Sequence, residues 1–208
     1  MRKILMAAVC AVMLVGCGEG FRFEVEMPTR YPDATFYLSP ENNPTTYYMK
    51  AKSDSEGVVR FEGRMRQPVA ACVSDGYVAV SHTFFVEEGS VKFGYLSETD
   101  KTIVAMGTES NDAYNQYLVD MKALEVKYAT CDSTCVNVAD IEAEMNRDFE
   151  ALGAAVQAAN YDNILGVYLF VKEGLWLTAP ERVDSIVACF SPEMREHPYM
   201  REVLQKAK

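Results

Sequence analysis

The spacing of the apolar residues changes near residue 108, and this change restricts the possible folds more than any other feature of the chain. Before it, in FRFEVEM (21–27), Phe23 and Val25 alternate with charged residues, which is the two-residue period of a half-buried strand. Similar short runs follow, separated by Pro, Asn, Asp, Ser and Gly, in TFYL, TTYYMKAK, GVVRFEGRM, PVAACVS, YVAV, TFFVEE, SVKFGYL and TIVAMG. Many short strands joined by turn residues predict an antiparallel β-sandwich or a partly open barrel.

Beyond residue 108, the apolar residues recur at steps of three and four, which is the period of one helix face. One stripe consists of Tyr114, Tyr117, Leu118, Met121, Leu124 and Tyr128, and a second consists of Val138, Ile141, Met145, Phe149, Leu152 and Val156. Ser110 or Asn111 can cap the first helix, and Asn137 can cap the second. Two such helices joined by a short loop predict an antiparallel helical hairpin.

Further helical segments complete the second half of the chain. Residues 164–171 are apolar nearly all round, which indicates a buried helix, and residues 178–181 (TAPE) have the pattern of a capping box with proline in the first turn. Shorter helical pieces begin at Ser191 and His197, each of which precedes a proline. The sequence therefore predicts an α+β fold, with a β-sandwich-like domain over residues 17–108 and an α-helical bundle over residues 109–208 packed on or beside it.

The N-terminus has the three regions of a secretory signal: basic residues at Arg2 and Lys3, an apolar run over residues 4–15, and the small residue Gly16 before Cys17. The apolar run would extend only about 18 Å as a helix, which is too short for the ~30 Å hydrocarbon core of a bilayer. The segment LVGC (14–17) resembles the lipobox of bacterial lipoproteins. This resemblance implies that residues 1–16 are a signal peptide and that Cys17 becomes the acylated first residue; the alternative is an ordinary signal peptide with Cys17 near the cleavage site by chance.

Charge and the residues after Cys17 suggest where the protein is located. The formal net charge of −10 disfavours nucleic acid and anionic lipid as partners, because both require clustered Lys and Arg, although the charge can also serve solubility alone. The membrane contact that we expect is therefore made by acyl chains on Cys17. Gly18 rather than Asp follows Cys17, which favours the outer membrane with the domain in the periplasm; Glu19 leaves export to the cell surface open.

Four cysteines remain after Cys10 leaves with the signal and Cys17 takes lipid: Cys72, Cys131, Cys135 and Cys189. An even number in an exported chain fits disulfide bonds. Cys131 and Cys135 enclose CDSTC between the two helical stripes, and we favour a structural bridge there, because Asp132 would raise a neighbouring thiol pKa, whereas redox pairs have a lowered one. A redox pair remains the alternative. Cys72 and Cys189 form either a second bridge or two small buried apolar residues.

Aromatic residues crowd the first strands and suggest a ligand-binding surface. If Tyr47 and Tyr48 lie in one strand, one of them must face away from the core, and this pair is our candidate surface for a glycan or a peptide. His82 and His197 have no ligand spacing around them, so we expect turn or surface histidines. The motifs of common hydrolase, phosphate and calcium sites are not found, and we expect no metal and no cofactor.

Several segments together resemble a lipoprotein domain of unknown function that precedes a thioredoxin-like domain in bacterial thiol-disulfide interchange proteins. The resemblance runs from about residue 21 to the end, through GVVRFEG (57–63), FFVEEGSVKF (84–93), MGTESNDAYNQY (106–117) and LTAPERVDSIVACFSPEMREHPY (177–199). It depends mainly on Gly57, Phe61, Gly63, Pro68, Glu87, Gly89, Gly107 and Asn111. The Trp-Cys-x-x-Cys signature of the redox domain is not found here, since Trp176 is followed by Leu177. The resemblance implies location and architecture but no activity.

Two functions are compatible with these observations. The first is a lipid-anchored lipoprotein of the cell envelope, a non-enzymatic binding or assembly module that faces the periplasm and engages an envelope protein or a glycan. The second is a thiol-disulfide partner that uses Cys131 and Cys135, alone or as an accessory to a separate thioredoxin-like oxidoreductase.

Overall fold

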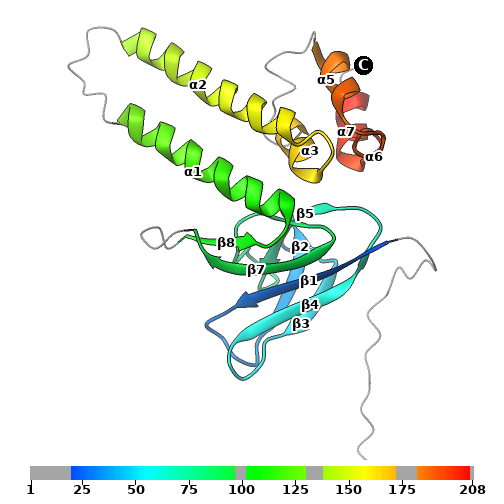
Figure 1. Cartoon of the computed structure of the whole chain (residues 1–208). Coiled ribbons are helices and arrows are strands. Elements are labelled where there is room, and N and C mark those ends of the chain that lie inside the picture. The colour runs from blue at the N-terminus through cyan, green and yellow to red at the C-terminus, as the bar shows by residue number, and fades with distance from the viewer. Residues whose placement is uncertain (1–19, 97–101, 130–137, 172–181, 207–208) are drawn as a thin grey trace, which may run out of the picture.

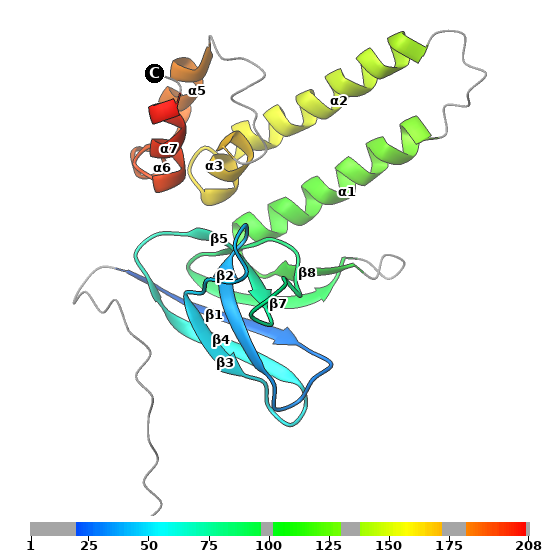
Figure 2. The same ribbon diagram turned by 180° about the vertical axis from the view of Figure 1, so that it is seen from behind.

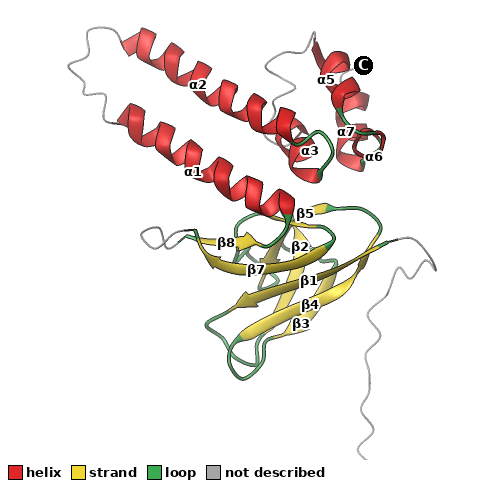
Figure 3. Ribbon diagram, in the orientation of Figure 1, coloured by secondary structure: helices red, strands yellow, loops and turns green. Residues whose placement is uncertain are grey.

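The computed structural model describes residues 20–96, 102–129, 138–171 and 182–206, and all structural statements below refer to these ranges. Strands come first and helices second, so the predicted α+β class is confirmed (Figures 1 and 3). The strands are β1 (Phe21–Pro28), β2 (Thr35–Pro40), β3 (Met49–Lys52), β4 (Val58–Met65), β5 (Val69–Ser74), β6 (Phe84–Val86), β7 (Gly89–Tyr95) and β8 (Ile103–Met106). The helices are α1 (Glu109–Ala129), α2 (Val138–Ala159), α3 (Ile164–Val171), α5 (Val183–Cys189), α6 (Pro192–Arg195) and α7 (Pro198–Lys206).

The strands form two four-stranded sheets, ordered β4-β1-β7-β8 and β3-β2-β5-β6. Their alternating residues behave as the sequence predicts: Phe23 and Val25 of the first sheet and Phe36 and Leu38 of the second are buried in one apolar core. In β1, the charged residues that alternate with them are exposed (Arg22) or half-buried (Glu24 and Glu26). Burial of these large side chains contributes roughly 1.5–3 kcal/mol each, which is the main force holding the two sheets together.

The expectation of purely antiparallel pairing is wrong at one place. β1 and β7 run parallel, with Phe23 opposite Gly89 and Glu26 opposite Lys92, while β1 pairs antiparallel with β4 on its other side. The chain leaves β4, builds β5 and β6 in the second sheet, and returns as β7 on the far side of β1. Alternating polarity shows which face of a strand is buried but does not encode its direction, so this crossover could not be read from the sequence.

β5 and β6 have apolar side chains on both faces, and this places them between two cores. Ala71 and Phe84 point into the core between the sheets, whereas Ala70 and Phe85 belong to a second core formed with the helices. The ring of Phe85 makes edge contacts with Tyr114 of α1 and Tyr168 of α3. The helices therefore pack on the outer face of the β5–β6 pair. Figures 1 and 2 show α1 beginning beside β5.

The helical half is built around α3, as predicted from its apolar composition. Ile164–Phe170 is buried throughout, and Gly166 allows the helix to approach the Asn160 carbonyl, because a Cβ there would lie 1.9 Å from that oxygen. α1 and α2 form the predicted hairpin and extend away from the sheets (Figure 1). The capping prediction for α1 is wrong: α1 begins at Glu109, so Ser110 and Asn111 lie inside it and contact the β half instead. The predicted caps at Asn137 and at residues 178–181 lie outside the described residues.

Candidate ligand-binding surface

Two loops lie against strands β2 and β5 of the second sheet. The first loop, residues 41–48, joins β2 to β3, and the second, residues 75–80, follows β5. The first is fixed from below by Ser39 and Ser74, which are fully buried on neighbouring strands: the Ser74 hydroxyl donates to the Pro44 carbonyl at 3.0 Å, and the two hydroxyl oxygens are 3.0 Å apart. In addition, the Tyr48 N–H donates to the Leu38 carbonyl at 2.8 Å. These bonds hold the loop in one position against the sheet.

Four tyrosines gather at these loops, and we name Tyr37, Tyr47, Tyr48 and Tyr77 the tyrosine surface. Tyr47, Tyr48 and Tyr77 are 55%, 43% and 83% exposed. Tyr37 is half-buried in β2, and its ring lies 4.9 Å from the ring of Tyr47 at an interplanar angle of 49°. The two predicted surface residues are therefore both exposed, because β3 begins only at Met49 and the alternation of a strand does not apply to them.

The second loop presents Tyr77 and is also held by defined bonds. Gly76 packs its backbone on the Tyr37 ring with φ +98°; a Cβ at this position would lie 3.1 Å from the ring. The Asp75 carboxylate accepts from the N–H groups of Val78 and Tyr77, and these bonds lower the pKa of Asp75 below its ordinary value. The predicted strand at residues 77–80 is reduced to a single bridge, and Tyr77 stands at an exposed turn.

The tyrosine surface continues toward the helical half through Tyr48. Burial raises the pKa of the Tyr48 hydroxyl, and the charge of Glu41 raises it further. Burial likewise raises the pKa of Tyr199 in α7, with smaller contributions from Tyr48 and Glu41. Both phenols are thus neutral in ordinary buffers, and they are suited to stacking and to hydrogen bonding rather than to acting as charged nucleophiles.

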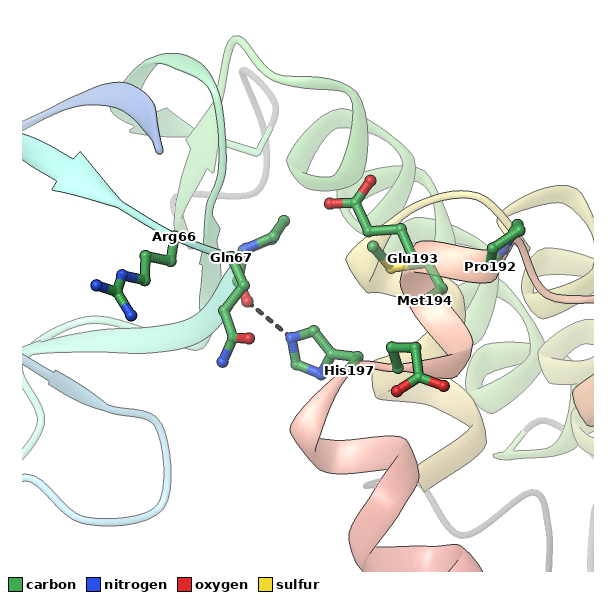
Figure 4. Close-up of a pocket in the computed structure, with 8 residues that line it drawn as sticks. Arg66, Gln67, Pro192, Glu193, Met194 and His197 are labelled. Atoms are coloured by element: carbon green, nitrogen blue, oxygen red, sulfur yellow. Dashed lines mark hydrogen bonds between the residues drawn. The ribbon is translucent and has the colours of Figure 1, made fainter. Parts of the chain in front are cut away.

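A cleft of about 220 Å³ lies at the joint between the two halves (Figure 4). It is lined by Arg66, Gln67, Pro68, Pro192, Glu193, Met194, Glu196 and His197. His197 is only 3% exposed, and its Nε2 lies 2.9 Å from the Pro68 carbonyl, 129 positions earlier in the chain. Of the two expected settings, a turn or the surface, the turn is confirmed and the surface is not: His197 lies between α6 and α7 but is buried, and it connects the start of α7 to the turn before β5. His82, in contrast, is exposed.

The protonation of His197 follows from its two contacts. The Tyr199 N–H donates to Nδ1 at 3.3 Å, so Nδ1 is unprotonated and Nε2–H donates to the Pro68 carbonyl. Burial lowers the pKa of His197 below its ordinary value, and the bond to Pro68 and the charge of Glu193 oppose this only in part. A neutral histidine held in one tautomer is a structural link between the halves.

The residues on which the resemblance to the lipoprotein domain depends include several that shape turns or join the two halves. Gly57 and Gly107 have φ of +79° and +99°, and a Cβ at either would lie under 3 Å from a backbone oxygen. Pro68 accepts the bond from His197, and the Glu87 carboxylate accepts from the N–H and hydroxyl of Ser110 at 2.9 and 2.6 Å. The pattern therefore marks turns and the joint between the halves.

Cys72 and Cys189 do not form a disulfide bond in the structure. Both thiols are free, and Cys189 is exposed on α5, where its Sγ lies 3.4 Å from the Ser185 carbonyl. Cys72 is buried with its Sγ 3.5 Å from the Pro40 carbonyl, and burial raises its pKa to about 11, with a further contribution from Glu41. Cys17, Cys131 and Cys135 lie outside the described residues.

The sequence places Tyr37 among the aromatic residues of the first strands but not in the candidate pair, and it gives no indication of Tyr77 or of the serine pair. The Asp75-Gly76 dipeptide is a turn signal that could have placed Tyr77 in a loop. The pairing of Ser39 with Ser74 depends on the strand register and had no local signal.

Within the described ranges, no cluster of three His, Cys, Asp or Glu side chains could bind a metal ion, and no helix has the length and apolarity needed to span a bilayer. Comparisons of the chain with protein-family models, with curated proteins and with solved structures found no match.

Proposed function

We propose that this protein is a lipid-anchored module of the cell envelope that binds an envelope protein or a glycan through the tyrosine surface. In this proposal Cys17 carries the acyl chains that hold the protein at the outer membrane, with the folded part in the periplasm. The LVGC segment and the preceding signal-like region support the anchor. We also propose that the β half is a β-sandwich or a partly open barrel: the common core of its two sheets supports the first, and the contact between β3 and β4 supports the second.

The observation that supports binding most strongly is that the exposed tyrosines stand on loops fixed by buried bonds. Exposed single aromatics are ordinary on a protein surface, but a contiguous group is typical of interaction sites. A side chain that is ordered before binding loses less conformational entropy when a ligand arrives, and each immobilised side chain otherwise costs about 0.5–1.5 kcal/mol. Ser39 and Ser74 hold the backbone that presents Tyr47 and Tyr48, which fits this requirement.

The thiol-disulfide hypothesis depends on Cys131 and Cys135, which lie outside the described residues. Of the described thiols, Cys72 does not suit exchange, because it is buried and its raised pKa keeps it protonated near neutral pH. We therefore retain binding as the proposed function.

The proposal is tested with the purified chain and envelope fractions from the organism that produces it. Polysaccharide and membrane-protein fractions are immobilised, and retention of the fluorescently labelled chain is measured. We expect that Tyr47→Ala and Tyr77→Ala reduce retention on one fraction about tenfold, which corresponds to the loss of roughly 1.4 kcal/mol of binding free energy. Tyr95→Ala is the matched control, because Tyr95 is 58% exposed but lies on the other sheet. Equal retention of all variants would refute the proposal.

A further inference from the structure

We infer that the ligand of the tyrosine surface is a neutral oligosaccharide, an inference that rests on the proposed function. Three properties of the described structure lead to it: the edges of the second sheet, the shape of the tyrosine surface and its charge.

The edges of the second sheet do not favour a peptide added as a further strand. At β6, the backbone N–H and carbonyl of Phe85 are both bonded to the side chain of Asn111, at 2.9 and 2.8 Å. At the opposite edge, β3 is four residues long and lies against β4 of the other sheet. Strand addition needs a row of available backbone groups, so an extended peptide would find little main-chain affinity here.

The tyrosine surface also differs from a groove that accepts a helix. Tyr47 and Tyr77 are exposed at loops, and none of the four tyrosines lines the cleft at the joint. Tyr37 and Tyr47 instead present tilted rings beside one another. The apolar C–H face of a pyranose ring packs on a tyrosine ring, while the phenol hydroxyl bonds to sugar hydroxyls.

The polar side chains around the tyrosines complement hydroxyl groups. Lys50 lies directly opposite Tyr37 on the neighbouring strand, which puts both on the same face of the sheet. Asn42 is exposed in the first loop. Amide and ammonium groups donate to sugar hydroxyls, and the phenol hydroxyls both donate and accept.

The charge of this region selects against charged ligands. The two loops carry Glu41 and Asp75, Lys50 lies opposite Tyr37, and the Asp75 carboxylate is bonded to its own loop. No cluster of basic residues stands in these two loops to attract an anion, and the net charge of −10 on the whole chain repels polyanions. A neutral oligosaccharide meets no repulsive field there, and the Lys50 ammonium can donate to its hydroxyls.

The experiment uses the purified mature chain and four defined probes: cellohexaose, xylohexaose, maltohexaose and, as the anionic control, a hexamer of galacturonic acid. Binding is measured by isothermal titration calorimetry in about 0.05 M and about 0.5 M NaCl, where charge interactions are screened to different extents. We expect at least one neutral hexasaccharide to bind, with an affinity that changes less than about threefold with salt. The anionic hexamer should not bind.

Variants decide whether the tyrosines make the contact. Tyr47→Ala and Tyr77→Ala should weaken binding about tenfold or more, Tyr47→Phe should retain most of it because the ring is preserved, and Tyr95→Ala should not change it. Circular dichroism of each variant verifies folding. Absence of binding by all three neutral probes overturns the inference, as does binding that Tyr47→Ala and Tyr77→Ala leave unchanged. If these variants still lose retention on an envelope protein fraction, the proposed function stands and the ligand is a protein.

Discussion

The side-chain amide of Asn111 in α1 bonds to both backbone groups of Phe85 in β6: Nδ2–H donates to the Phe85 carbonyl at 2.8 Å, and the Phe85 N–H donates to Oδ1 at 2.9 Å. The amide takes the place that a further strand would have at this edge. Both residues are buried, and Nδ2 also donates to the Thr108 hydroxyl at 2.8 Å, so one side chain closes the sheet and fixes the start of α1.

Replacing Asn111 with alanine should therefore destabilise the protein by about 3 kcal/mol, since it leaves a buried N–H and a buried carbonyl of Phe85 without partners. Urea denaturation followed by circular dichroism measures this change. Asn115→Ala is the control, because Asn115 is half-buried and its side-chain amide donates to the Ala105 carbonyl at 2.7 Å. A loss no larger than that of the control would contradict the role given to Asn111.

Ser74→Ala should loosen the first loop of the tyrosine surface. The change removes the bond to the Pro44 carbonyl and the contact with the Ser39 hydroxyl, and should cost about 1–3 kcal/mol. Hydrogen exchange of the Tyr48 amide, which is bonded to Leu38, should become faster. Ser55→Ala, at an exposed turn position, should leave this exchange rate unchanged; if both variants behave alike, the serine pair does not fix the loop.

His197 should make stability depend on pH. Burial lowers its pKa in the folded chain below the ordinary 6.5, so unfolding takes up a proton between these two values. The contribution of His197 to the free energy of unfolding is complete above pH 6.5. It decreases as the pH falls below this value, by at most about 1.4 kcal/mol per pH unit, until the folded histidine also protonates. Three charged residues line the same cleft as His197, namely Arg66, Glu193 and Glu196, and the ring of Tyr199 contacts the imidazole.

Urea midpoints from pH 7.5 to 5.0 measure this dependence. In His197→Gln the slope between about pH 6.5 and 5.5 should become shallower than in the native chain, whereas His82→Gln should retain it, because His82 is exposed. An unchanged slope in His197→Gln would show that His197 does not carry the effect.

The two described thiols should react at very different rates. Cys189 is exposed, whereas Cys72 is buried with a pKa raised to about 11. A thiol reagent at pH 8 should modify Cys189 within the native protein and Cys72 only after denaturation. Mass spectrometry of digested samples identifies the modified residue. Rapid native labelling of Cys72 would contradict the buried position.

Cys17 should carry acyl chains. Mass spectrometry of the protein from membranes should show an N-terminal peptide that begins at an acylated Cys17, and Cys17→Ser should shift the protein to the soluble fraction. Cys72→Ser provides the control for loss of a cysteine. An unmodified N-terminus at Cys17 would exclude the anchor.

The sequence predicted those features that local patterns encode. The alternation in FRFEVEM places Phe23 and Val25 in the core, and the composition of residues 164–171 predicts a buried helix, because each depends on neighbours along the chain. The parallel partner of β1 and the link from His197 to Pro68 depend on segments far apart, for which one sequence carries no local signal.

The candidate site was predicted in part and for an incomplete reason. Strand alternation predicts that one of Tyr47 and Tyr48 faces away from the core, but both are exposed, because they precede β3. Tyr37 joins them only through the ring contact with Tyr47 and the packing of Gly76, which depend on two loops that meet in space.

The position of β5 and β6 between two cores bears on how this architecture can be inherited. A gene fragment that ended near residue 108 would encode strands whose Ala70 and Phe85 side chains were exposed to solvent. Such a product would be prone to aggregation. Recombination that exchanged one half would also have to supply apolar side chains that pack against those of the half that remained. The two halves are therefore expected to descend together, as one unit of evolution, and to melt in a single cooperative transition.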